Sequence, residues 1–231
     1  MRWIFEPYEL GVPERYDMVK TKGGTEWAIY ERNGWIIETW PKSKIDGEGV
    51  QKDYAPAYYF YMIIKYYHPN GMLKSRVKYM LGVTFGKKEF FDEQGNLVEI
   101  EDRDAKFEGV KIKREELMEI LEKAGVVNFK TGKHSIVHNW PTKRKDLTNP
   151  LKTDGSFYKI LEDYITISFE PAKIEDGEEV NPPMWYVGVH SYDYEVDYLT
   201  VYQINAHTGK YIVKKRKRIM SPEFKYVPIE D

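Results

Sequence analysis

Three glycine-containing turns, each flanked by aromatic or β-branched residues, constrain the fold of this chain most. The turns are Asn33-Gly34, Asn70-Gly71 and Gln94-Gly95. Glycine supplies the positive φ that a tight turn needs, and asparagine tolerates that backbone region better than most residues. Because Asn-Gly between such runs is the strongest short-range signal of a hairpin, we expect antiparallel strands around Gly34, Asn70, Gly71 and Gly95.

The hydrophobic period changes after Gly109 and indicates one helix. Four apolar side chains fall at i, i+3, i+4 and i+7 on one helical face, namely Leu117, Ile120, Leu121 and Ala124. Glu115 and Glu116 suit the first turn of this helix, and Glu119 can pair with Lys123 one turn later. Gly125 stands where a left-handed residue ends a helix.

Beyond the helix the sequence predicts an irregular stretch and then a meander of strands. Residues 130–155 are rich in Lys, Thr, Asn, Pro and Gly, and residues 173–183 are expected to form an acidic loop. Residues 158–169 fit a helix followed by a strand or a strand alone. Strands are expected at 185–190, 198–204 and 211–213, with Gly209 in the turn between the last two.

The predicted fold class is therefore α+β, with antiparallel β-hairpin repeats followed by a helix packed on an antiparallel sheet. We place a β-hairpin region at residues 1–108. An α+β region follows at 109–231, with an insertion at about 126–184.

Composition excludes several functions. The chain has 231 residues, a formal charge of -2 and no cysteine, so thiol chemistry and disulfides are absent. With no net positive charge, we expect no nucleic-acid partner.

We expect no export signal at the N-terminus, because an acid and a proline interrupt the apolar run that such a signal needs. The longest apolar stretch, residues 58–64, is too short to span a membrane and is typical of a central buried strand. The expected location is the cytoplasm, or the periplasm or cell surface if a leader has been removed.

Several motifs approach a catalytic or metal site without completing one. Residues 82–88 resemble a phosphate loop but are one residue short, with Lys88 at the position of the Mg²⁺-binding hydroxyl, so a strand turn is favoured. His134 and His138 have zinc-like spacing, yet Ser135 replaces the following glutamate. We therefore expect no cofactor, no metal and no catalytic residue.

Two charged stretches near the C-terminus have other interpretations. Asp193, Glu195 and Asp197 alternate like calcium ligands, but Tyr198 and Ile204 occupy positions that need glycine and glutamate. Carboxylates at period two instead form an acidic strand edge, and tyrosine anchors in a charged rim suit protein recognition. We therefore predict partner contacts at a group of five residues, Tyr192, Asp193, Tyr194, Glu195 and Asp197. The basic run 214–218 lacks interleaved aromatics and fits a solvated edge strand better than a nucleic-acid platform.

Residues 65–100 contain Tyr66-Tyr67, the turn at Asn70-Gly71, Gly86-Lys87-Lys88, Phe90-Phe91 and the turn at Gln94-Gly95. In this pattern the stretch resembles the variant MORN repeats of bacterial toxin-antitoxin proteins. It implies a protein that neutralises a toxin by binding it.

The C-terminal half combines an expected helix at 114–125, a strand at 185–190 and a hairpin closing at Thr208-Gly209. In these features it looks like a PepSY domain, in which a helix packs on a short antiparallel sheet. Asn205-Ala206 departs from the Asp-Ala pair that is commoner in that family. This resemblance implies restraint of a peptidase or sensing at the cell envelope.

Both resemblances imply a non-catalytic binding protein, and we expect a bacterial immunity or antitoxin-like protein that occludes a toxin or peptidase. Two alternatives remain open. One is an envelope or cell-surface protein of PepSY or MORN type with an unknown ligand. The other is an enzyme of unknown class, since paired carboxylates such as Glu195 and Asp197 fit a cleft as well.

Overall fold

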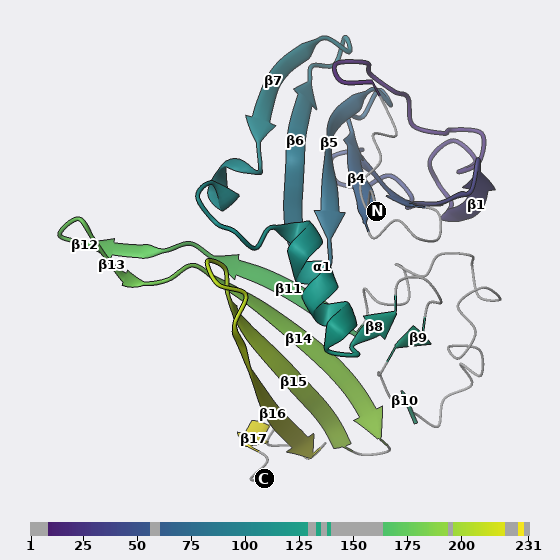
Figure 1. The fold of residues 1–231 in the computed structure, drawn as a ribbon. Helices are drawn as coiled ribbons and strands as arrows, with labels where there is room; N and C mark the ends of the chain where they lie inside the picture. The colour runs from purple at the N-terminus through teal and green to yellow at the C-terminus, as the bar shows by residue number, and fades with distance from the viewer. Residues whose placement is uncertain are drawn as a thin grey trace. The chain divides into compact units, whose positions relative to one another are not determined.

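The computed structural model describes residues 9–55, 61–128, 133–134, 138–139, 164–193, 196–219 and 226–228 (Figure 1). These residues are rich in antiparallel β-structure and contain one α-helix. The chain divides into two compact units. The first holds the described residues up to Met80 together with Thr84–Ala105, and the second holds Leu81–Val83 and the described residues from Lys106 onward.

The first unit is built on a seven-stranded sheet whose strands lie in chain order. The strands are β1 Ala28–Arg32, β2 Trp35–Thr39, β3 Gly49–Tyr54, β4 Met62–Tyr67, β5 Leu73–Met80, β6 Val83–Phe91 and β7 Leu97–Asp102. The central strand predicted within residues 58–64 is present from Met62, where Met62 and Ile63 are buried. Residues 58–60 lie outside the described part.

The hairpins predicted from the three glycine-containing turns are present. Asn33 has φ 53° and Gly34 has φ 79°, which joins β1 to β2 through the two-residue turn that matches strand twist. Gly71, with φ 83°, joins β4 to β5, and Gly95, with φ 89°, joins β6 to β7. The phosphate-loop-like residues form the β5–β6 turn and the start of β6, as expected for a strand turn.

The predicted helix is confirmed as α1 Arg114–Lys123 in the second unit, after a 3-10 turn at η1 Ala105–Phe107. Leu117 and Leu121 are buried, as the period predicted, and Met118 is buried with them. The carboxylate of Glu116 accepts a hydrogen bond from the backbone N–H of Lys113 at 3.0 Å, which caps the first turn. Gly125 has φ 73° just after the helix.

The main sheet of the second unit is a meander of long strands. Antiparallel β14 Met184–Asp193, β15 Val196–Asn205 and β16 Tyr211–Ile219 contain the three predicted strands and extend beyond them. Further strands join this sheet: β10 His138–Asn139, β11 Ile165–Glu170 and β17 Tyr226–Pro228. The short strands β8 Val127–Asn128 and β9 Lys133–His134 pair separately. No helix among the described residues combines the length and apolar character needed to cross a membrane.

Two expectations about this unit were incomplete or wrong. The loop predicted at residues 173–183 is instead a hairpin of β12 Lys173–Glu175 and β13 Glu178–Asn181, because Asp176 (φ 51°) and Gly177 (φ 83°) form a tight turn. Residues 165–169 are strand, and residues 158–163 lie outside the described part.

The core of the second unit centres on Trp185, which is fully buried. Its indole N–H donates to the carbonyl oxygen of Ile112 at 2.7 Å. Its ring stacks on Phe107 with centroids 5.1 Å apart and lies 4.8 Å from Phe169. The backbone amide of Ile112 donates in turn to Ala206 at 2.8 Å, so this tryptophan ties the segment before α1 to the end of β15.

Replacing Trp185 with phenylalanine is expected to destabilise the protein by about 2–4 kcal/mol, because the substitution removes ring volume and leaves the buried Ile112 carbonyl without its donor. Urea unfolding followed by circular dichroism measures the loss. Trp27, which is 54% exposed, is the matched control, and Trp27→Phe is expected to change the unfolding free energy by less than about 0.5 kcal/mol. Equal effects of the two substitutions would contradict the central role of Trp185.

Candidate functional site

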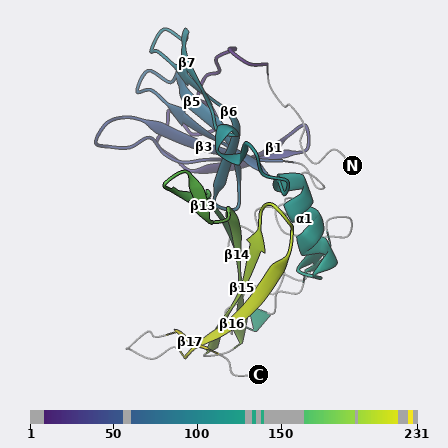
Figure 2. The ribbon, with the colours of Figure 1, turned by 60° about the vertical axis from the view of Figure 1, so that its left-hand side comes forward.

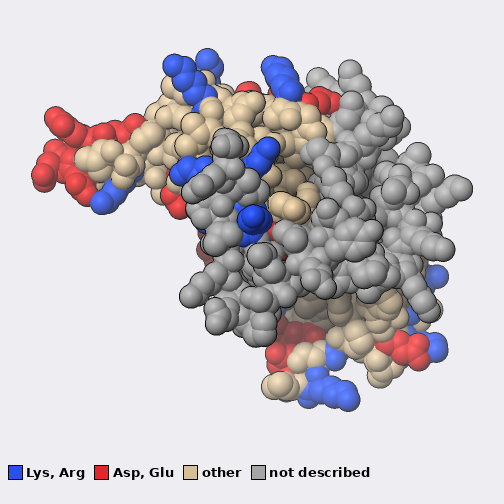
Figure 3. Space-filling view, turned by 90° about the horizontal axis from the view of Figure 1, so that it is seen from below, with Lys and Arg blue, Asp and Glu red and all other residues tan. Residues whose placement is uncertain are grey.

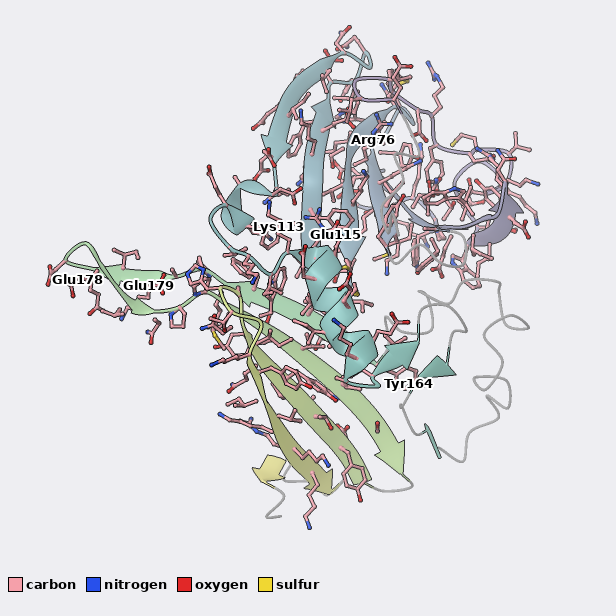
Figure 4. The ribbon with its side chains drawn as sticks, viewed as in Figure 1. Arg76, Lys113, Glu115, Tyr164, Glu178 and Glu179 are labelled. Atoms are coloured by element: carbon pink, nitrogen blue, oxygen red, sulfur yellow. The ribbon has the colours of Figure 1, made fainter. Side chains whose placement is uncertain are left out.

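The strongest surface candidate is the β12–β13 hairpin, residues 173–181, called the acidic arm from here on. Its seven strand residues are all exposed, and it extends beyond the paired part of β11 and β14 (Figures 1 and 2). The arm carries four carboxylates against Lys173, namely Glu175, Asp176, Glu178 and Glu179. Figure 3 shows acidic side chains gathered on this projecting part at the left of the view, and Figure 4 labels two of them.

The local sequence explains why the arm forms a hairpin despite its charge. Asp176 and Gly177 both have positive φ, as the two central residues of this turn type require. An Asp-Gly pair meets that requirement at low cost. The turn thus places the flanking residues in register, with Glu175 opposite Glu178 and Ile174 opposite Glu179.

The strand register of the arm destabilises the hairpin but leaves its side chains open to a partner. Glu175 and Glu178 face each other directly, and like charges at opposed positions destabilise a strand pair. Ile174 is 57% exposed and Val180 is 46% exposed, so the apolar side chains contribute little burial. A cationic partner surface would relieve the repulsion between Glu175 and Glu178.

The contacts made by the arm are weak. Lys173 lies 2.6 Å from Glu175, and the Nε2 atom of His207 lies 3.0 Å from Glu179. Both pairs are largely exposed, and exposed pairs contribute little to stability. These contacts leave most of the arm's carboxylate surface open to solvent.

The first unit contains a different cluster, a row of charges that we call the charged row: the buried Asp53, Lys65, Arg76 and Glu89 with the half-buried Glu14. Four of its members lie on the adjacent strands β3, β4, β5 and β6. Lys65 and Arg76 are directly opposed cations, a destabilising arrangement by itself. The carboxylate of Glu14 offsets the repulsion between these two cations, because it lies 2.6 Å from Lys65 and 3.0 Å from Arg76.

The remaining members complete the ion pairs. Asp53 lies 2.6 Å from Lys65, and Glu89 lies 2.7 Å from the Nε atom of Arg76. Arg76, labelled in Figure 4, also donates to the carbonyl oxygen of Glu9 at 2.8 Å. The backbone N–H of Gly11 donates to Glu89 at 2.5 Å. The row therefore holds the N-terminal segment against the sheet, which is a structural role.

Burial and charge shift the pKa values around this row. Burial lowers the pKa of Lys65, but the attraction of Asp53 and Glu14 outweighs it, and the net pKa is raised. Burial raises the pKa of Tyr67 well above its usual value, and Asp53 and Glu14 add to the effect. Burial, together with Asp17, raises the pKa of Tyr30 to about 12.

The residues predicted to contact a partner lie around the connection between β14 and β15, where Tyr192 is paired with Asp197. Tyr192 and Asp193 lie on the last residues of β14, and Tyr194 and Glu195 lie outside the described part. Asp197 does not fit an exposed acidic edge, because it is 1% exposed, with its carboxylate 3.6 Å from the Nδ1 atom of His190. Alternation alone gave no signal for this burial, since it depends on neighbours from other strands.

The motif-based candidates fall on ordinary strands. Tyr198 and Ile204, at the positions where a calcium loop needs glycine and glutamate, lie within β15. His134 and His138 lie on β9 and β10, where their side chains are outside the described part. In the described residues, no group of three or more His, Cys, Asp or Glu side chains is placed to hold a metal ion. Sequence reasoning missed the acidic arm, although Asp176-Gly177 between charged residues was the signal for it.

Comparisons of this chain with models of protein families, with curated proteins and with solved structures gave no match.

Raising the pH is expected to destabilise the first unit. Lys65, Tyr67 and Tyr30 all have pKa values that are higher in the folded chain than in an unfolded one. Each group holds its proton more tightly when folded, so its contribution is fully present below pH 10.0, the ordinary tyrosine value, and is lost as the pH rises toward about 12. We therefore expect the urea concentration at the unfolding midpoint, measured from about pH 8 upward, to decrease between pH 10.0 and about pH 12.

The variant Tyr30→Phe tests whether the raised pKa values cause this loss of stability at high pH, because it removes one of the titrating groups. We expect its stability to fall less steeply with pH than that of the parent protein. A midpoint that stays constant up to about pH 12 in the parent would contradict the raised pKa values.

Proposed function

We propose that this chain is a non-catalytic binding protein of the immunity or antitoxin type, which neutralises a basic protein partner by occluding it. The observation that carries the proposal is the acidic arm, with exposed carboxylates around the exposed side chains of Ile174 and Val180. Exposed apolar side chains beside charged ones are common in protein-binding surfaces.

The charge of the acidic arm supports a basic partner. Four carboxylates and one lysine within nine residues give the arm a charge of about -3, while the whole chain has a formal charge of only -2. A concentrated charge of this kind steers a basic surface toward the arm and raises the association rate. The direct opposition of Glu175 and Glu178 adds a further gain, because a bound cation removes a repulsion present in the free protein.

Occlusion needs a firm scaffold as well as a contact surface. The hairpin repeats of MORN type and the helix packed on an antiparallel sheet of PepSY type belong to this proposal, and both resemblances imply binding without chemistry. Tyr192 and Asp193 at the end of β14, with Tyr194 and Glu195 beyond it, are proposed as further contacts.

If the proposal holds, co-expression with the product of the neighbouring gene should give a stoichiometric complex. A stable complex of this kind buries at least roughly 1,000 Å². Co-purification followed by light scattering measures the stoichiometry. A chain that stays monomeric in the presence of that product would contradict the proposal.

The arm itself is tested by the double substitution Glu175→Lys with Glu178→Lys. We expect the association rate with the same partner to fall at least about tenfold at low salt, because the steering charge is reversed. Stopped-flow or surface-based kinetics measures this rate.

The matched control is Glu99→Lys with Glu108→Lys, which changes the net charge equally at two exposed carboxylates outside the arm. Its association rate should fall much less. If both double variants slow association to the same extent, the net charge and not the arm is responsible.

A further inference from the structure

One face of the β15–β16 hairpin brings tyrosines and lysines together. The register pairs Tyr198 with Lys217, Thr200 with Lys215 and Tyr202 with Val213. Directly paired residues share a face of the sheet, and so do residues two apart on one strand. Six residues of this side are called the tyrosine–lysine face: Tyr198, Tyr202, Tyr211, Val213, Lys215 and Lys217. Thr200 and the buried Ile204 lie on the same side.

The face is accessible along β16. Residues 211–217 are all exposed, with Tyr211 and Val213 each 43% exposed. Tyr198 and Tyr202 on β15 are half-buried, so their rings are held by the sheet while part of each remains in contact with solvent. None of the six residues is acidic.

The tyrosines form a side-by-side pair at one end of the face. The rings of Tyr202 and Tyr211 have centroids 6.0 Å apart and planes inclined by 52°. Burial, with a further contribution from Tyr211, raises the pKa of Tyr202.

The alternation of β16 divides the basic run between two faces. Lys215 and Lys217 lie on the face with the tyrosines, whereas Lys214 and Arg216 lie on the opposite face. The run lacks aromatic residues in the linear sequence, but β15 supplies them across the sheet. The strand is also not a simple edge, because β17 pairs with it at Arg216, Lys217 and Arg218.

We propose that the tyrosine–lysine face binds single-stranded nucleic acid. Lysines attract the phosphates, and exposed aromatic rings stack with unpaired bases, a combination that binds single strands with little sequence preference. A polyanion without rings would gain only from the charges and would use both faces of β16 alike. A duplex keeps its bases stacked internally and leaves the tyrosines unused.

The face is tested by fluorescence anisotropy of the full chain with a labelled oligothymidylate of about 15 nucleotides, long enough to cover a site of this size. For Lys215→Ala with Lys217→Ala we expect the affinity to fall about tenfold or more at low salt. We also expect the slope of log affinity against log salt to shrink by about 1.4, since each phosphate contact on a single strand contributes about 0.7.

Stacking is tested by Tyr211→Leu, which keeps an apolar side chain and removes the ring. The expected loss of affinity is about tenfold, with the salt slope unchanged, because no charge is altered. Tyr66→Leu is the control, since Tyr66 is 39% exposed on β4 of the other unit and should not affect binding. Equal urea midpoints for all variants exclude a loss of folding.

The decisive control is Lys214→Ala with Arg216→Ala, which removes the same charge from the opposite face of the same strand. We expect a clearly smaller loss of affinity than for Lys215→Ala with Lys217→Ala. Equal losses, wild-type binding by Tyr211→Leu, or equal competition by dextran sulfate or a duplex would overturn the proposal. The arm variants do not alter this face, so the result is independent of the proposed partner binding.

Discussion

The structure of the first unit depends on the buried contacts of Arg76. Its side chain is 1% exposed and pairs with Glu89, which is 0% exposed, while Glu14 links it to Lys65 on the next strand. Loss of one partner from such a group leaves an uncompensated buried charge, which costs about 3–5 kcal/mol. The N-terminal segment therefore belongs to the folded unit, because Glu14 pairs with both Lys65 and Arg76, the two opposed cations.

Local rules predicted the elements that depend on local contacts. The turn at Asn33-Gly34 follows from the φ values that those two residue types accept, and α1 follows from the spacing of Leu117 and Leu121. The strands of the meander were predicted for the same reason, although β14, β15 and β16 extend further than their apolar runs. A strand ends where its pairing with the neighbouring strands ends, and the composition of a segment does not reveal that pairing.

The charged row was beyond prediction, because its partners are distant in sequence. Glu14 lies 51 residues from Lys65 and 62 from Arg76. A lysine or arginine between apolar residues of a strand predicts a solvated face, and only the packing of residues 9–14 over the sheet turns these positions into interior ones. Asp197 follows the same logic in the second unit, where an alternating acid proved to be buried.

The second unit shows why the net charge of a chain says little about its partners. Acids are concentrated on the arm and bases on β16, so the sum of charges hides two strong local fields. The strand register then decides what each field can recognise. On the arm it opposes Glu175 to Glu178 and leaves two apolar side chains exposed, whereas on β16 it places Lys217 beside Tyr198. The linear sequence contains both sets of charges, but the pairing of strands determines which side chains lie next to each set. For this reason the arrangement of strands, more than composition, determines which surfaces of this protein are suited to binding.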